Sequence, residues 1–171
     1  MIFFWILPAL GAALTDAFHN LLIKKQTRTL DALTVSWIRS LWISILLLPL
    51  VFIFSTRASY LFWGILIIRT LFDAVATVLY VASIKHSDLA LALPLLALTP
   101  LFITVVEFIL TGIYPSIIGF IGICLVVVGT YLLHTKKEEG GVLAPVKNIL
   151  MNKGNRMMLG VALIWSITST L

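Results

Sequence analysis

The chain has 171 residues, of which 61% are hydrophobic and 11% are charged, and its mean hydropathy is +1.12. Soluble domains are about 45–50% apolar and about 25% charged, so this composition argues against a water-soluble globular domain and against a disordered chain. The formal net charge is +5, but the Lys and Arg residues gather between long apolar runs. That distribution is typical of an integral membrane protein and argues against a nucleic-acid binder. Because Cys124 is the one cysteine and no zinc-type Cys/His spacing occurs, we expect no disulfide, no metal and no cofactor.

Apolar runs long enough to cross a bilayer follow one another along the chain. A transmembrane helix needs about 20 mostly apolar residues to cross a hydrocarbon core of about 30 Å. The sequence predicts five such spans, namely Ile2–Ile23, Leu33–Phe54, Tyr60–Ser83, Leu89–Leu110 and Pro115–His134. The first of them is not a secretory signal, because Asp16, His19 and Asn20 interrupt its apolar block.

A longer polar connection, residues 135–156, follows the fifth span and reads as a linker. It leads to a further apolar run, Met157–Leu171. At about 1.5 Å per residue this run would form a helix of about 22 Å, which is too short to cross the bilayer. We therefore expect the chain to be the front part of a longer protein, and a short interfacial helix is the alternative.

The positive charges are distributed unevenly between the connections. Those after the first, third and fifth spans hold most of the Lys and Arg, whereas the amino terminus and the connections after the second and fourth spans hold only Arg57. The positive-inside rule then places the first set in the cytoplasm and the amino terminus outside.

The stretch from residue 80 to residue 133 carries the most specific pattern in the chain. A proline-leucine-phenylalanine step at 100–102 lies near the centre of the fourth span, and a threonine-glycine turn follows at 111–112. The fifth span then carries Gly119, Gly122 and Gly129. This pattern resembles the carboxyl half of an EamA repeat, the unit of the drug/metabolite transporter superfamily. Arg39 stands where these repeats often carry an arginine, whereas Ile113 departs from the family, which usually has a glutamate there.

The resemblance covers about residues 5–135 and implies an all-α integral membrane protein. Residues 1–134 would form a first five-helix repeat, 135–156 a polar linker, and 157–171 the start of a second repeat. The complete protein would then be a ten-helix transporter built from two inverted repeats, an architecture common among secondary transporters. The ten-helix members of the family usually place both termini in the cytoplasm. This conflicts with the charge distribution and leaves the orientation open.

Small residues and prolines within the spans favour particular roles in packing. Gly119, Gly122 and Gly129 would let neighbouring helices approach closely. Pro94 and Pro100 would bend the fourth span around a central cavity, or would be tolerated kinks without a role in transport.

Polar residues in the first span are candidates for substrate binding or coupling. Ionisable side chains at bilayer depth are costly, so they usually face the interior of a helix bundle and mark a pathway. Asp16 and His19 are three residues apart and share a helix face, with Asn20 beside them. The carboxylate of Asp16 would bind substrate or carry a coupling proton, and the alternative is a structural polar contact.

The second and third spans carry further candidates. Arg69 and Asp73 are four residues apart and can pair along the helix. Arg39 would either reach a lipid headgroup or bind an anionic group of a substrate. The aromatic residues near the span ends, among them Tyr80, read as an interfacial belt, but Trp42 and Trp165 lie deeper and could line a pocket for an organic substrate.

These features favour a secondary transporter of small organic metabolites in the cell membrane, an exporter that works by alternating access and uses a proton as its coupling ion. One alternative is a half-transporter that works as a dimer, like the small multidrug resistance proteins. Another is a membrane scaffold without transport activity. The sequence has no metalloprotease, phosphate-binding or nucleophile-elbow motif, so we expect no enzyme. The expected partners are the lipid bilayer, a small-molecule substrate and either a second repeat or a second subunit.

Overall fold

The structure, a computed structural model, describes residues 6–53, 59–112, 114–134 and 144–170. These residues form helices and contain no strand, which confirms the expected all-α class. The helices are α1 (Ile6–Gln26), α2 (Ala32–Ile53), α3 (Tyr60–His86), α4 (Leu89–Ala92), the 3-10 helix η1 (Leu93–Leu98), α5 (Thr99–Thr111), α6 (Ile117–Leu133), α7 (Ala144–Met151) and α8 (Lys153–Thr170).

Four of the predicted spans coincide with helical stretches that are long and apolar enough to cross a membrane. These are α1, α2 from Ala32 to Leu50, α3, and the stretch from Leu89 to Thr111 that contains α4, η1 and α5. The fifth predicted span corresponds to α6, a shorter apolar helix of 17 residues. The beginning of the first predicted span, Ile113 and residues 135–143 lie outside the described residues.

The fourth span changes its helix type where its two prolines lie. Pro94 stands within the first two positions of η1, and Pro100 stands likewise at the start of α5. A proline has no backbone N–H and its ring clashes with the carbonyl four residues earlier, so an α-helix cannot pass through it unchanged. The chain therefore crosses this stretch as an α-helical turn, a 3-10 segment and a second α-helix.

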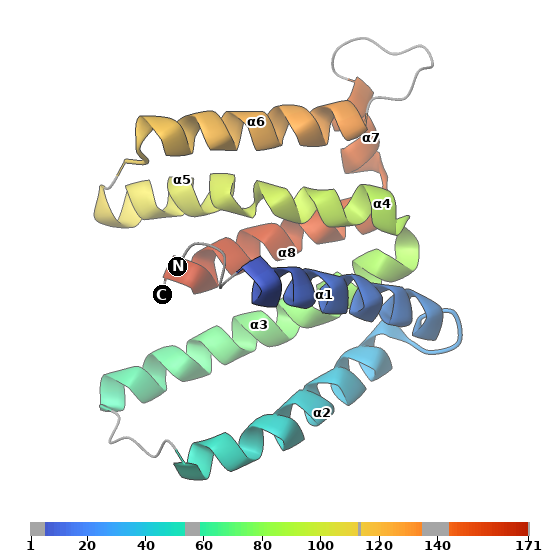
Figure 1. Cartoon of the computed structure of the whole chain (residues 1–171), viewed down its shortest axis with the longest axis vertical. Helices are drawn as coiled ribbons and strands as arrows, with labels where there is room; N and C mark the ends of the chain where they lie inside the picture. The colour runs from blue at the N-terminus through green and yellow to red at the C-terminus, as the bar shows by residue number, and fades with distance from the viewer. Residues whose placement is uncertain (1–5, 54–58, 113, 135–143, 171) are drawn as a thin grey trace.

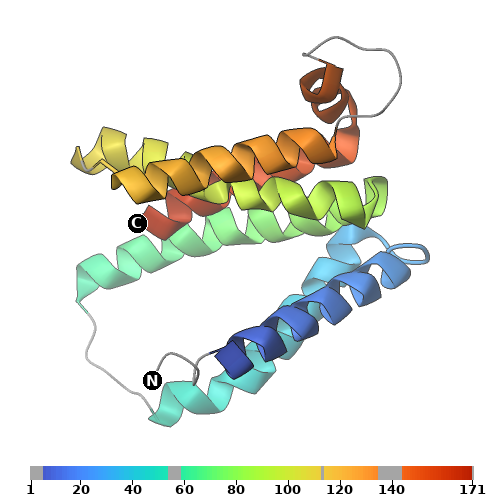
Figure 2. The ribbon, with the colours of Figure 1, turned by 45° about the horizontal axis from the view of Figure 1, so that its top comes forward.

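The helices form a layer in which α8 occupies a central place (Figure 1). It lies between α3 on one side and α5 on the other, so the last described helix of the chain is inserted into the bundle of earlier ones. α2 packs beside α3, and α6 packs against η1. Figure 2 shows the same layer from another direction, with α1 and α2 spread away from the other helices.

The buried apolar residues gather where the end of α3 meets the beginning of α8. Val81 and Ile84 of α3, Leu95 of η1, and Met158 and Val161 of α8 are fully buried. By contrast, the apolar side chains at residues 41–50 of α2 and most of those at residues 60–71 of α3 are exposed. The bundle is therefore tightly packed at one end and open at the other.

The last helix begins four residues earlier than the apolar run predicts, because Asn152 caps it. The side-chain Oδ1 of Asn152 accepts hydrogen bonds from the backbone N–H groups of Gly154, at 2.9 Å, and Asn155, at 3.2 Å. This is the usual N-cap arrangement, in which a side chain satisfies backbone donors that have no partner in the first turn. The stretch that reads as a linker thus contains α7 and the first turn of α8.

Candidate functional site

A chain of hydrogen bonds joins α1 to α3, two of the helices long and apolar enough to cross a membrane. The hydroxyl of Tyr80 donates to Oδ1 of Asn20 at 2.5 Å, and Nδ2 of Asn20 donates to Oδ2 of Asp16 at 3.2 Å. Asn20 and Tyr80 are only 3% and 4% exposed. A buried amide and a buried hydroxyl each need a partner, and here each satisfies the other. Asp16 is itself exposed on α1 but is held to this pair.

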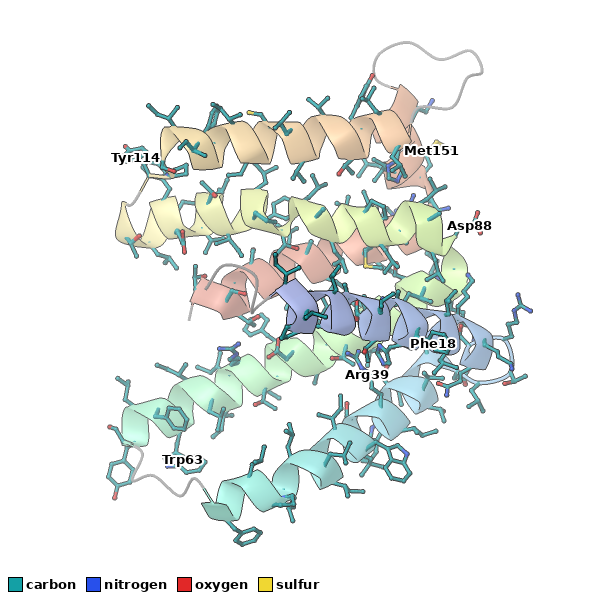
Figure 3. The ribbon with its side chains drawn as sticks, viewed as in Figure 1. Phe18, Arg39, Trp63, Asp88, Tyr114 and Met151 are labelled. Carbon is teal, nitrogen blue, oxygen red and sulfur yellow. The ribbon has the colours of Figure 1, made fainter. Side chains whose placement is uncertain are left out.

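Arg39 of α2 approaches the same tyrosine from another direction. Its guanidinium carbon lies 5.7 Å from the centroid of the Tyr80 ring, a cation–π distance. Figure 3 shows Arg39 in the region where α1, α2 and α3 come together. We call Asp16, Asn20, Arg39 and Tyr80 the polar cluster. Asp16 and Arg39 are both close enough to His19 and to Tyr80 to interact with them electrostatically.

A hollow of about 400 Å³ opens between α1 and α2 beside this cluster. We call it the α1–α2 hollow. His19 and Gln26 of α1 and Arg39 of α2 contribute its polar wall. Trp42 contributes an indole, and the remaining wall is aliphatic. The structure therefore brings together five residues that the sequence singled out: Asp16, His19, Asn20, Arg39 and Trp42.

The last helix also reaches the site, through Trp165. The rings of Tyr80 and Trp165 have centroids 5.6 Å apart and are inclined by 36°. The interpretation of Tyr80 as part of an interfacial belt is wrong, because its ring is buried between helices and its hydroxyl is bonded within the protein. The sequence does carry a signal that Tyr80 lies on a polar face of its helix, since it lies seven residues after Asp73 and seven before Ser87. Residues at that spacing share one helix face.

Arg69 and Asp73 form the expected ion pair along α3, with Nε and Oδ2 3.7 Å apart. Both side chains remain about half exposed. Thr168 of α8 donates to Oδ1 of Asp73 at 3.4 Å, so this pair is linked to the last helix. Asp73 precedes Tyr80 by two helical turns, about 10 Å along the axis. The pair is therefore separate from the polar cluster, and its role in binding or coupling stays a prediction.

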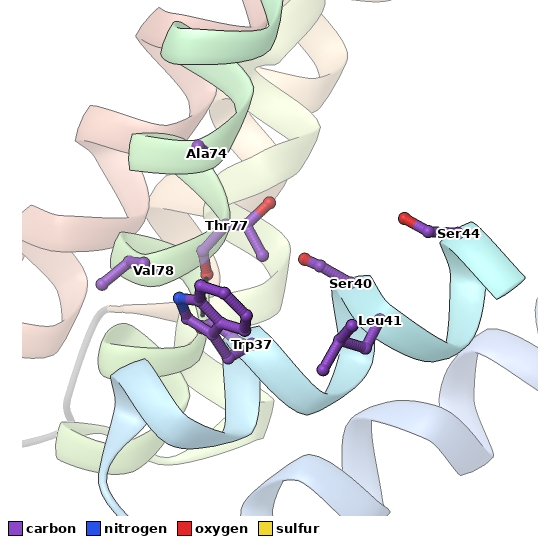
Figure 4. A pocket seen from close by; sticks show the side chains of 8 residues that line it. Trp37, Ser40, Leu41, Ser44, Ala74, Thr77 and Val78 are labelled. Atoms are coloured by element: carbon purple, nitrogen blue, oxygen red, sulfur yellow. Dashed lines mark hydrogen bonds between the residues drawn. The ribbon is translucent and has the colours of Figure 1, made fainter.

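A second depression, of about 340 Å³, lies between α2 and α3 (Figure 4). Trp37 and a row of serines on α2, Ser36, Ser40 and Ser44, face Thr77 across it. The Ser36 hydroxyl lies 2.7 Å from the carbonyl oxygen of Ala32 in its own helix and 3.5 Å from that of Thr77. This depression thus has a hydroxyl-bearing wall, and none of the described residues that line it is ionisable.

The glycines of α6 show no close helix contact in the described residues. A Cβ atom added at Gly122 or Gly129 would meet nothing within 4 Å, and one added at Gly119 would meet only Ser116 and Pro115, which belong to the preceding turn of the chain. Their expected packing role stays a prediction. A close approach exists instead at Gly154 of α8, which the sequence did not single out. Within the described residues, no group of three or more His, Cys, Asp or Glu side chains is arranged to hold a metal ion.

Comparison with known proteins gave one family and one relative. The model of the EamA-like transporter family matches residues 3–135. A protein of Archaeoglobus fulgidus named "Uncharacterized transporter" is 25% identical over 142 residues, which cover 79% of this chain and 50% of that protein. The chain thus spans about half the length of the curated relative it matches. No solved structure gave a match.

Proposed function

This chain belongs to the EamA-like transporter family, and from that premise we propose that it forms part of a secondary transporter, not an enzyme. The transporter exports small organic metabolites across the cell membrane by alternating access. Four helical stretches long and apolar enough to span a bilayer support its place in the membrane. The other half of the transporter comes from a second repeat, a proposal supported by the greater length of the archaeal relative.

The polar cluster is the observation that carries this proposal. It places a carboxylate, an amide, a guanidinium and a phenol from three helices next to a hollow of about 400 Å³. Ionisable groups at this depth are expensive to insert and usually mark the path of a substrate or an ion. A hollow of this size also falls within the range of about 300–1,000 Å³ that is common for small-molecule sites.

Asp16 is the coupling residue in this proposal. Its carboxylate is exposed, while its hydrogen bond to Asn20 connects it to the buried Tyr80. Binding or loss of a proton at Asp16 changes that hydrogen bond, and the change passes through Asn20 to α3. A proton gradient can then drive the helices between two arrangements.

Export by cells tests this proposal. Cells that produce the complete protein are compared with empty-vector cells by untargeted mass spectrometry of medium and cell extract. We expect at least one small organic metabolite to accumulate several-fold in the medium. Asp16→Asn keeps the size of the side chain but cannot carry the proton, so it should reduce this accumulation to the empty-vector level at equal amounts of protein in the membrane.

Asp88→Asn is the matched control, since Asp88 lies in the connection before α4 and its side chain makes no capping hydrogen bond. This variant should export as the unmodified protein does. An uncoupler that collapses the proton gradient should reduce export by the unmodified protein to the empty-vector level, as Asp16→Asn does. Unchanged metabolite profiles, or full export by Asp16→Asn, would contradict the proposal.

A further inference from the structure

Arg39 differs from Arg69 and Lys24, two other cations of the helices, in the partners of its side chain. Arg69 is paired with Asp73, and Lys24 donates to two backbone carbonyls at the end of α3. Nε of Arg39 is buried and has no hydrogen-bond partner among the described residues. Its contact with the Tyr80 ring satisfies none of the five N–H donors of a guanidinium.

Arg39 is partly buried, and a buried N–H donor such as its Nε is costly to leave unsatisfied, so a partner for this side chain is expected. Asp16 is the nearby carboxylate, but its Oδ2 accepts from Asn20, and no ion pair joins it to Arg39 in this structure. The space on the other side of Arg39 is the α1–α2 hollow, which it lines. The partner that the arginine lacks thus has room to bind there.

The walls of the hollow indicate the chemistry of this partner. Beside Arg39 they carry an imidazole, from His19, and the amide of Gln26, both able to donate hydrogen bonds. Leu22, Ile38 and Trp42 supply an apolar surface in the same hollow. None of the described residues that line it carries a carboxylate. Guanidinium groups bind carboxylates through two parallel hydrogen bonds, whereas aliphatic and indole surfaces favour an apolar body.

We propose that the α1–α2 hollow binds a small organic anion, a carboxylate with an apolar or aromatic body, whose charged group pairs with Arg39 and whose body packs against Trp42. That this anion is also the transported substrate rests on the function proposed above. Its binding does not depend on transport and can be measured separately.

A titration of the purified complete protein in detergent tests the proposal with three probes of the same shape. These are 3-phenylpropionate, its neutral amide 3-phenylpropionamide and the cationic 3-phenylpropylamine, measured by isothermal calorimetry. We expect the carboxylate to bind at least tenfold more tightly than the amide, and the amine to bind least tightly. Arg39→Gln should abolish the preference for the carboxylate, and Arg39→Lys should retain part of it because a point charge remains.

Two further variants separate the charged contact from the apolar one. Arg156→Gln removes an exposed cation of α8 that does not line the hollow, and should keep the preference for the carboxylate. Trp42→Ala should weaken the binding of the carboxylate and of the amide by the same factor. Trp63→Ala, which changes a tryptophan near the start of α3 and outside the hollow, should leave the binding of both unchanged. Far-UV circular dichroism and gel filtration confirm that each variant is folded.

The proposal is overturned if the amide or the amine binds as tightly as the carboxylate, or if Arg39→Gln keeps the preference in a folded protein. The export measurement described above then decides a separate question. Asp16-dependent export of neutral or cationic metabolites, without carboxylate binding, would overturn the anion site and leave the proposed transport intact. Arg39-dependent carboxylate binding without export of any metabolite would support the anion site and overturn the proposed transport.

Discussion

Tyr80 connects three helices to α3 through different parts of one side chain. Its hydroxyl donates to Asn20 on α1, its ring lies beside the guanidinium of Arg39 on α2, and the same ring packs against Trp165 on α8. The hydrogen bond to Asn20 is the one of these contacts that depends on a single atom. It can therefore be removed without removing the ring.

Tyr80→Phe should destabilise the protein because it leaves Oδ1 of Asn20 buried without its donor. A buried polar group that loses its partner costs about 1–3 kcal/mol. The ring contacts with Arg39 and Trp165 are retained in this variant, so the loss reports the hydroxyl. We expect a lower midpoint of thermal unfolding in detergent.

Tyr60→Phe is the matched control for this measurement. Tyr60 is 96% exposed at the start of α3, so the same chemical change there should leave the midpoint unaltered. Equal midpoints for Tyr80→Phe and Tyr60→Phe would mean that the bond to Asn20 contributes nothing to stability.

At the scale of the elements, the end of α3 is the place where α1 and α8 are attached. Nζ of Lys24 donates to the carbonyl oxygens of Ile84 and Ser87, both at 2.7 Å. Carbonyls in the last turn of a helix lack intrahelical partners, and a cation there also complements the helix dipole. On α8, the carbonyl of Gly154 accepts from the Ser83 hydroxyl at 2.7 Å. Both attachments therefore pair polar groups near the end of α3 with polar groups of another helix.

Gly154→Ala should push α8 away from the end of α3. A Cβ at this position would lie 2.6 Å from Oγ of Ser87, 2.7 Å from Cβ of Ser87 and 2.9 Å from the backbone oxygen of Ser83. The backbone oxygen cannot rotate away, so the helices must separate. Overpacking of this kind typically costs about 1–3 kcal/mol. We expect a lower unfolding midpoint and loss of the Ser83 hydrogen bond.

Gly122→Ala provides the comparison, since a Cβ there meets no described atom within 4 Å. Alanine is the better helix former by up to about 1 kcal/mol, so this variant should be as stable as the unmodified protein or more so. A Gly154→Ala variant with the stability of Gly122→Ala would show that α3 and α8 do not approach as closely as the structure indicates.

The spans could be predicted from the sequence because the length and hydropathy of the apolar runs are enough to identify them. The regions of α3, α5 and α6 agree with the prediction to within a few residues. The start of α8 could not be found in this way, because it depends on the cap at Asn152 and not on apolar residues. The same holds for the site. Asp16 and Arg39 stand out as charges at membrane depth, but Tyr80 becomes a site residue only through the partners that other helices bring to it.

At the scale of the whole molecule, α8 completes the interior of the bundle. It supplies Met158, Val161 and Ala162 to the core and covers fully buried residues of α3 and η1. Lipid could replace the apolar part of this cover, but it cannot replace the hydrogen bonds from Ser83 and to Asp73 that cross the interface. The first helices therefore depend on α8 for the pairing of polar groups that lipid would leave unsatisfied.

This dependence predicts that a cut between α6 and α8 is tolerated and that loss of α8 is not. A protease site inserted between Gly140 and Gly141 allows the purified protein to be cut in detergent. We expect the two fragments to elute together as one symmetric peak in gel filtration, because the α3–α8 contacts hold them. A chain that ends after residue 143 should instead give aggregated or polydisperse protein, since the polar groups of α3 then lack their partners. Separation of the fragments after cutting, together with a monodisperse shortened chain, would show that the first five spans fold independently of α8.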